Sequence, residues 1–277
     1  MELPIGESVE NFIQFLLNNF EPVFDGIANI LGGFMEGTGD FLLMIPPLFF
    51  IIILSAMAWF LANKKVALFT VASLFLVFGM GLWQSFVKTF VLVIVATLIS
   101  LIIGIPMGVL SSKRKKLDRI VTPILDFMQT MPPFVYLIPA VMFFGIGDVP
   151  GVISTVVFSM PPAIRLTKLG LNQVPEELEE VGDSFGLTPF QMLYKIKLPL
   201  ALPSIMAGIN QTIMMSLSMV VVASMIGTKG LGSDVLNGIQ RNDIGIGFEA
   251  GLSVVILAII LDRITSSLGT ITQRKKA

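Results

Sequence analysis

Long apolar runs separated by short polar segments dominate this chain. A membrane-spanning helix needs roughly 20 apolar residues, and seven segments approach or exceed that length. They are Phe41–Ala62, Val66–Trp83, Phe86–Leu110, about Ile120–Ile146, about Val149–Leu169, Ala201–Ile226 and about Gly247–Leu268. Prolines interrupt helical hydrogen bonding, and we expect them to break two segments: Pro132, Pro133 and Pro139 in the fourth, and Pro161 and Pro162 in the fifth. The pattern predicts an all-α integral membrane protein, a polytopic bundle of about seven spans.

The first 40 residues follow a different pattern, with apolar side chains at steps of three and four residues. This spacing places them on one side of a helix. The stripe consists of Val9, Phe12, Ile13, Leu16, Phe20, Val23, Ile27 and Leu31. We expect an amphipathic helix that either lies in the lipid interface or packs against the protein's own bundle.

Basic residues are distributed unevenly between the expected loops. With seven spans, 15 of the 18 basic residues (all except Lys88, Lys229 and Arg241) fall on the side of the C-terminus. Basic loops stay in the cytoplasm. The charge distribution therefore predicts a cytoplasmic C-terminus and an external N-terminus.

Composition excludes several classes of function. Apolar residues make up 54% of the chain and charged residues 13%, against about 25% charged residues in soluble domains. A net charge of −1 gives no electrostatic case for binding nucleic acid. Cysteine and histidine are absent, and with no cluster of metal-ligating residues we expect no metal site. No phosphate-binding G-x-x-x-x-G-K-[ST] loop occurs, so we expect this chain not to be an enzyme by itself.

The acid-rich segment between Asn172 and Pro199 predicts two short helices. Pro175 suits the first helical position and is followed by four glutamates within five residues, which favour a helix N-terminus. Gly186 fits a left-handed residue that ends this helix. Thr188 and Gln191 then form a capping-box pattern around Pro189.

Each helix of this elbow carries an apolar stripe, although the segment lies between two spans. The residues are Val174, Leu178, Val181 and Phe185 in the first helix, and Phe190, Leu193 and Ile196 in the second. Either the protein's own bundle or a second protein must cover them. Pro199 either stops the second helix or opens the next span.

The same segment resembles the cytoplasmic "EAA" loop of ABC importer permeases. Glu180-Val-Gly is followed after three residues by Gly186, and after nine more by Ile196-x-Leu198-Pro199. Val181 and Gly182 replace the family's alanines, and a mid-helix glycine costs roughly 1 kcal/mol. Longer stretches resemble permeases of the glycine betaine/proline betaine importers, from about Ser85 to the C-terminus. They are DFMQTMPPFVYLIPAVMFFGIGDVPGV, SMPPAIRLTKLGLNQVP, MAGINQTIMMSLSMVVVASMIG and GLG.

The resemblance implies a type I ABC importer permease in a bacterial cell membrane. Its domains would be an external segment (1–40), peripheral helices (41–84) and a transport core (85–277) with a coupling loop at 172–199. That loop would seat in a separate ABC ATPase subunit, which would bind ATP and Mg²⁺, while this chain binds no cofactor. The coupling residues would be Glu180, Gly186, Phe190, Leu193, Ile196, Leu198 and Pro199. A second permease copy, an external substrate-binding protein and membrane lipid complete the expected partners.

Broken and polar spans indicate where a solute could pass, because discontinuous helices often line transport sites. The candidates are Gln129, Met131, Pro132, Phe134, Tyr136, Met160, Pro161, Asn210 and Gln211. Helix kinks that serve packing, and hydrogen bonds between helices, are the alternatives. Gly104-x-x-x-Gly108 predicts close helix packing, and Asp126 is expected near Arg119 or Arg165, either paired or exposed.

The resemblance favours uptake of glycine betaine or a related small zwitterionic solute. Its quaternary ammonium would be attracted to aromatic faces. A permease for choline, proline, methionine or a sulfonate is the alternative within the class. An ATP-independent channel or secondary carrier is the alternative from another class.

Overall fold

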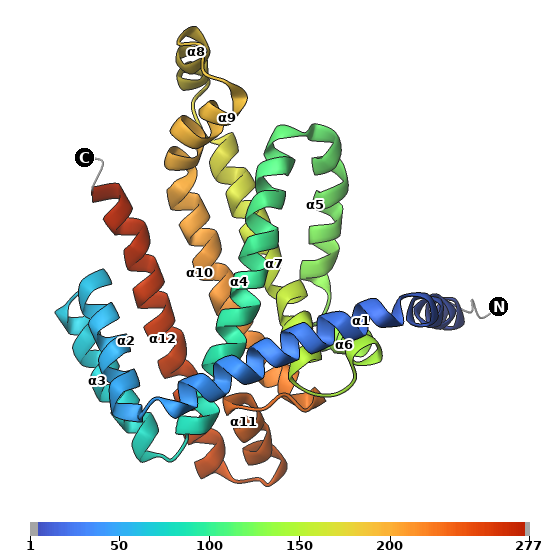
Figure 1. Ribbon diagram of the computed structural model, residues 1–277, viewed down its shortest axis with the longest axis vertical. Coiled ribbons are helices and arrows are strands. Elements are labelled where there is room, and N and C mark those ends of the chain that lie inside the picture. The colour runs from blue at the N-terminus through green and yellow to red at the C-terminus, as the bar shows by residue number, and fades with distance from the viewer. Residues whose placement is uncertain (1–4, 275–277) are drawn as a thin grey trace.

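The computed structural model describes residues 5–274 as helices joined by short turns (Figure 1). In chain order these are α1 (Ile5–Met44), α2 (Pro47–Leu61), α3 (Lys64–Gly79), α4 (Trp83–Lys113), α5 (Lys115–Thr130), η1 (Pro133–Tyr136), α6 (Leu137–Phe144), α7 (Asp148–Asn172), α8 (Glu176–Ser184), α9 (Pro189–Met192), η2 (Leu193–Lys197), α10 (Leu198–Ala223), η3 (Ser224–Ile226), α11 (Leu231–Gln240) and α12 (Ile244–Arg274). The predicted all-α bundle is confirmed.

The centre of the bundle is α7, which packs against α4 on one side and α10 on the other. A Cβ atom on Gly104 would lie 2.8 Å from the Ala163 Cβ, and one on Gly108 would lie 2.7 Å from the Ile164 carbonyl oxygen. Likewise, a Cβ on Gly170 in α7 would come within 2.7 Å of the Ser204 Cβ in α10. The close packing predicted from Gly104 and Gly108 is confirmed, since small residues let membrane helices approach closely.

Polar side chains within the core bond across these same contacts. Thr97 of α4 donates to Ser216 of α10 at 3.3 Å. The hydroxyls of Ser100 and Ser159 share a hydrogen bond of 3.1 Å between α4 and α7. No water is present in hydrocarbon to satisfy such groups. Pairing the hydroxyls with one another therefore lets them be buried between helices.

The two proline-rich spans behave differently. The chain bends by 112° between α5 and η1–α6, so the predicted break at Pro132 and Pro133 is confirmed, although α6 continues through Pro139. The predicted break in the next span is wrong: α7 runs unbroken through Pro161 and Pro162. Both rings are buried in α7, whose close contact with α4 and α10 holds the helix where hydrogen bonds are missing.

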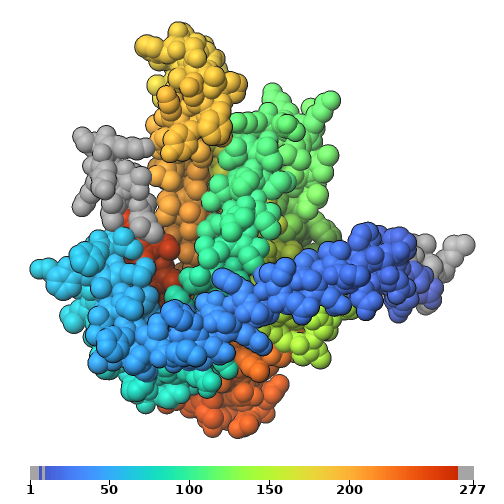
Figure 2. All heavy atoms as spheres, viewed as in Figure 1, coloured from blue at the N-terminus to red at the C-terminus, as the bar shows by residue number. Residues whose placement is uncertain are grey.

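The predicted first span is wrong at its start. Residues 41–44 form the last turn of α1, and the chain then turns by 101° into α2. The break falls at Ile45 and Pro46, because a residue before proline is disfavoured in helical geometry. In Figures 1 and 2, α1 lies across the bundle instead of running along it. The second predicted span also ends early, since Trp83 begins α4.

Among the described residues, four helical segments are long and apolar enough to cross a membrane, or up to six if each bent pair is one span. The predicted count of seven is not reached, because α3 has only 16 residues. In Figure 1, α8, α9 and the end of α12 point to one end of the bundle, and α11 lies at the other. Lys275 and Lys276, used in the charge prediction, lie outside the described residues.

Replacing Gly108 with alanine should lower stability, because the new Cβ would collide with Ile164 and Thr167 of α7. Overpacking of this kind costs about 1–3 kcal/mol. Gly251→Ala in α12 is the control: a Cβ there meets nothing within 4 Å, so better helix propensity should leave stability equal or higher. Thermal unfolding of the purified chain in detergent measures both. Equal midpoints for the two variants would contradict the role of Gly108.

Candidate functional site

The elbow consists of α8, α9 and η2, and its bend is built by backbone geometry at Gly186. This residue has φ +68°, a conformation that glycine adopts without a steric cost. Its N–H bonds to the Asp183 carbonyl at 2.9 Å, and the Leu187 N–H bonds to the Gly182 carbonyl at 3.0 Å. These two bonds form the Schellman ending of a helix. The predicted helix end is confirmed, while Pro175 caps α8 instead of occupying its first position.

The second half of the elbow begins at the predicted capping box. The Gln191 N–H donates to the Thr188 hydroxyl at 3.3 Å, and the Thr188 N–H donates to the Gln191 side chain at 2.9 Å. The chain then continues through the π-helical turn η2 into α10. Pro199 therefore lies in the first turn of α10 and does not stop a helix. Because proline donates no hydrogen bond, the wider π turn fits this position.

Inside the elbow, α8 packs against α9 and η2 through Gly182. A Cβ atom here would lie 2.5 Å from the Met192 Cε and 3.0 Å from the Ile196 Cδ1. Gly182 has a low helix propensity and so destabilises α8. Because it has no side chain, however, it lets α8 approach α9 and η2 closely. A salt bridge of 2.6 Å joins Glu179 of α8 to Lys197 of η2.

The base of the elbow packs against the bundle. Leu193 and Leu198 contact the apolar cluster of Leu171, Ala201 and Ile205, which joins α7 to α10. Self-packing therefore covers part of the apolar stripes predicted for the elbow. It covers Leu193 at this cluster and Ile196 beside Gly182 within the elbow.

Five other large side chains of the elbow are exposed, and we call them the elbow surface. They are Leu178 (39% exposed), Val181 (49%), Phe185 (82%), Phe190 (74%) and Tyr194 (68%). Exposed acidic residues lie among them in the sequence: Glu176, Glu177, Glu180 and Asp183. The elbow projects from the rest of the molecule in Figure 2. Carboxylates make burial in lipid costly, and exposed apolar patches mark protein contacts.

Four members of the elbow surface, Leu178, Val181, Phe185 and Tyr194, were not among the predicted coupling residues. Leu178, Val181 and Phe185 belong to the apolar stripe predicted for the first helix. Tyr194 follows Phe190 by four residues, a spacing that puts two side chains on the same side of a helix. That spacing was the available signal for Tyr194.

The predicted substrate-path residues do not gather at one place. Tyr136 is buried beside Met131, Phe158 and Met219, where α7 and α10 meet η1, and its hydroxyl donates to the Met128 carbonyl. Its ring lies 6.1 Å from that of Phe158. Gln129, Pro132 and Phe134 are instead exposed near the bend between α5 and η1.

The other path candidates lie on α7 and α10. Met160 packs against α5, and Pro161 is buried. Asn210 donates to Ser266 of α12 at 2.6 Å, whereas Gln211 is exposed. For Asn210 the structure favours the alternative of a hydrogen bond between helices.

Comparison with known proteins decides the family. The profile of the family described as "Binding-protein-dependent transport system inner membrane component" matches residues 100–276. This chain belongs to that family. The match begins within α4 and includes the elbow and all later helices of the described bundle.

Curated relatives cover nearly the whole of this inner membrane component. The glycine betaine transport system permease protein OpuAB of Bacillus subtilis is 46% identical over 96% of this chain and 94% of its own length. The glycine betaine/carnitine transport permease protein GbuB of Listeria monocytogenes is 47% identical over 96% and 95%. The glycine betaine/proline betaine transport system permease protein ProW of Escherichia coli is 45% identical over 96% and 75%. The predicted resemblance is confirmed.

Solved structures agree on the fold. A chain of the inward-facing MetNI methionine ABC transporter has a TM-score of 0.57 and 25% identity, covering 67% of this chain and 92% of that chain. The predicted ABC importer permease fold is therefore confirmed.

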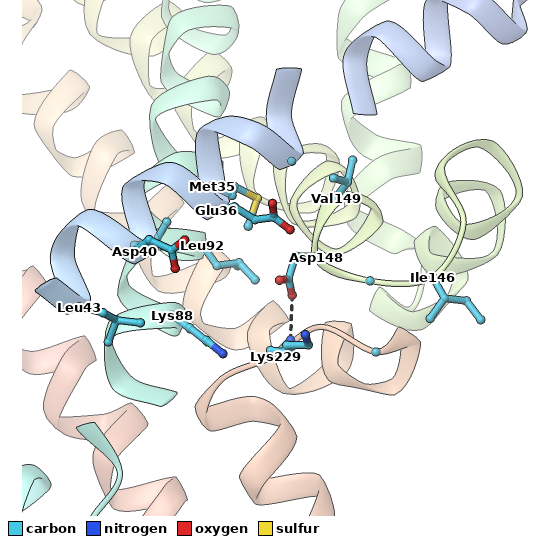
Figure 3. Close-up of a pocket in the computed structure, with 15 residues that line it drawn as sticks. Met35, Glu36, Asp40, Leu43, Lys88, Leu92, Ile146, Asp148, Val149 and Lys229 are labelled. Atoms are coloured by element: carbon cyan, nitrogen blue, oxygen red, sulfur yellow. Dashed lines mark hydrogen bonds between the residues drawn. The ribbon is translucent and has the colours of Figure 1, made fainter. Parts of the chain in front are cut away.

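At the other end of the bundle, a cavity of about 600 Å³ lies beneath α1 (Figure 3). Charged side chains of both signs line it: Glu36, Asp40, Lys88, Asp148 and Lys229. The Asp148 carboxylate accepts a hydrogen bond of 2.8 Å from the Lys229 backbone N–H, which joins the start of α7 to the turn after η3. Lys88 and Lys229, two of the three basic residues predicted to lie on the outer side, therefore line the same polar cavity.

Charged pairs elsewhere are structural. Arg165 of α7 forms a salt bridge with Asp126 of α5. This is the paired alternative that the sequence predicted for Asp126. Lys168 pairs with Asp118 one turn further along. Among the residues that the structure describes, no group of three or more acidic side chains is arranged to hold a metal ion.

Replacing Thr188 with alanine should loosen the elbow, because the Gln191 N–H loses its capping acceptor. Loss of such a cap costs about 1 kcal/mol, so local opening should become about fivefold more frequent. Hydrogen exchange of residues 176–197 in the purified protein measures this. Thr188→Ser keeps the hydroxyl and should exchange like the unaltered chain. Faster exchange in the serine variant as well would show that the cap is not the cause.

Proposed function

We propose that this chain is the permease subunit of an ABC importer that takes up glycine betaine or a related compatible solute. The elbow surface carries the coupling part of the proposal. It presents large apolar side chains on an acid-rich element. Its carboxylates disfavour burial in lipid, and its apolar side chains disfavour exposure to water, so a protein partner suits it best. The relatives that cover almost the whole chain carry transport of glycine betaine in their names, which supports the choice of solute.

The elbow surface would seat in a groove of a separate ATPase subunit, which binds ATP and Mg²⁺. The continuous helical path from Pro189 to Ile226 supports this role. Leu193 and Leu198 fix its start to α7, so a pull on the elbow would move α10 as a rod. ATP-driven approach of two ATPase subunits would then open the bundle outward, and hydrolysis would reset it.

A second copy of the permease would pack against α5. Ile120, Ile124 and Phe127 are more than half exposed and recur at steps of four and three, which makes one apolar side of the helix. Gln129 and Phe134 lie exposed further along the same chain segment. A solute path between two copies would include them, with aromatic faces that attract the quaternary ammonium weakly.

The elbow and the C-terminus would face the cytoplasm, and α1 would lie on the outer side of a bacterial cell membrane. This orientation follows from the basic residues near the elbow end and the absence of any basic residue in the first 40 positions. An external substrate-binding protein would deliver the solute at the end that carries α1 and α11.

Replacing Phe185 and Phe190 together with serine should weaken ATPase binding. Central aromatic side chains at interfaces contribute about 2 kcal/mol or more each, so co-purification of the ATPase subunit and solute uptake should both fall more than tenfold. Phe248→Ser is the matched control, because Phe248 is 69% exposed at the other end of the bundle. Unchanged co-purification in the double variant, with equal amounts in the membrane, would contradict the coupling role.

ATP hydrolysis by the reconstituted complex should be stimulated by glycine betaine together with its binding protein. Choline, proline and methionine, each with a candidate binding protein, are the compounds for comparison. If one of them stimulates ATP hydrolysis most strongly, that compound and not glycine betaine is the transported solute. Flux through vesicles that contain this chain alone, driven by a solute gradient, would instead favour a channel or secondary carrier.

A further inference from the structure

An apolar groove of about 590 Å³ runs between α2 and α3 at the edge of the bundle. Small residues form its floor, including Ser55 and Ala56 of α2 and Ala67 of α3. Larger side chains such as Trp59 and Leu68 form its walls. The groove thus arises because two neighbouring helices carry small side chains where they face each other.

The groove has the length of one lipid leaflet. Its lining extends from Leu48 to Phe60 along α2, about 18 Å at 1.5 Å per residue. The hydrocarbon core is about 30 Å thick, so one leaflet is about half of this. The hairpin is short, with 15 residues in α2 and 16 in α3. In a membrane of ordinary thickness, a hairpin this short would draw its turn toward the hydrocarbon, unless the membrane thins or the side chains at the turn snorkel to its surface.

Two lysines lie at the turn that closes this end of the groove. Lys64 lines the groove, and its ammonium lies 5.4 Å from the centre of the Trp59 ring. Lys65 follows it in the first turn of α3, where Asn63 caps the helix. Neither lysine takes part in a salt bridge within the described part of the chain. Positive charge at membrane depth calls for an anionic partner.

We propose that the α2–α3 groove binds one anionic phospholipid, with an acyl chain along its small-residue floor and the phosphate on Lys64 and Lys65. The apolar lining suits an acyl chain and offers little to a polar ligand. The lysine pair distinguishes this site from ordinary lipid contact, because basic residues near the membrane surface favour anionic lipid by about fivefold each. A lipid with a neutral headgroup would fill the groove without this advantage.

Trp59 supplies a direct reporter, since the chain has only 2 tryptophans and the other, Trp83, is buried. The full-length chain is reconstituted in mixed phosphatidylglycerol and phosphatidylcholine vesicles in which one lipid carries brominated acyl chains, which quench tryptophan on contact. A Trp59→Phe chain gives the contribution of Trp83. We expect the relative binding constant at Trp59 to favour phosphatidylglycerol by about fivefold or more. A ratio of one would overturn the proposal.

Two variant pairs separate the headgroup from the groove. Lys64→Gln with Lys65→Gln should bring the ratio close to one, whereas Lys115→Gln with Lys116→Gln, an exposed pair at the start of α5, should leave it unchanged. A ratio retained without Lys64 and Lys65 would rule out the phosphate site.

Ala56→Leu fills the groove floor and should lower quenching by both brominated lipids. Ala72→Leu is the same change on an exposed part of α3 outside the groove, and it should have no effect. Equal quenching in these two variants would show that the acyl chain does not lie in the groove.

Discussion

Close contact of α7 with α4 and α10 is the constraint on which the rest of the bundle depends. It requires glycine at the crossing points and polar side chains that bond to one another, because hydrocarbon offers them no other partner. The same contact keeps α7 helical through Pro161 and Pro162. With this centre fixed, the more loosely packed elements can bend or project: α5 breaks, α1 crosses the bundle, and the elbow extends away from it.

The elbow divides its apolar side chains between two tasks. Gly182, Met192 and Ile196 hold its two halves together, while Leu193 and Leu198 join it to α7 and α10. The elbow surface is left without a partner inside the protein. This arrangement suits the proposed coupling role, because an element that transmits force to α10 needs both a fixed base and an exposed contact surface.

The remaining features lie away from the elbow. The start of α7 and the turn after η3 are joined through Asp148 and Lys229 next to the charged cavity beneath α1. The α2–α3 hairpin lies at the edge of the bundle, where its groove opens on the membrane. Both regions contact α4, so their positions depend on the same core.

The sequence by itself determined the helical class, the family, and the elbow with its glycine bend and capping box. These signals are local: capping, left-handed glycine and three- or four-residue periodicity depend on neighbours within a few positions. Tertiary structure decided where the prolines bend the chain, since Pro132 lies at a surface break while Pro161 lies in a supported helix. It also decided that Phe185 is exposed while Ile196 is partly buried, and that Tyr136 and Asn210 lie apart. Periodicity gives a side of a helix, but only the packed neighbours determine what that side faces.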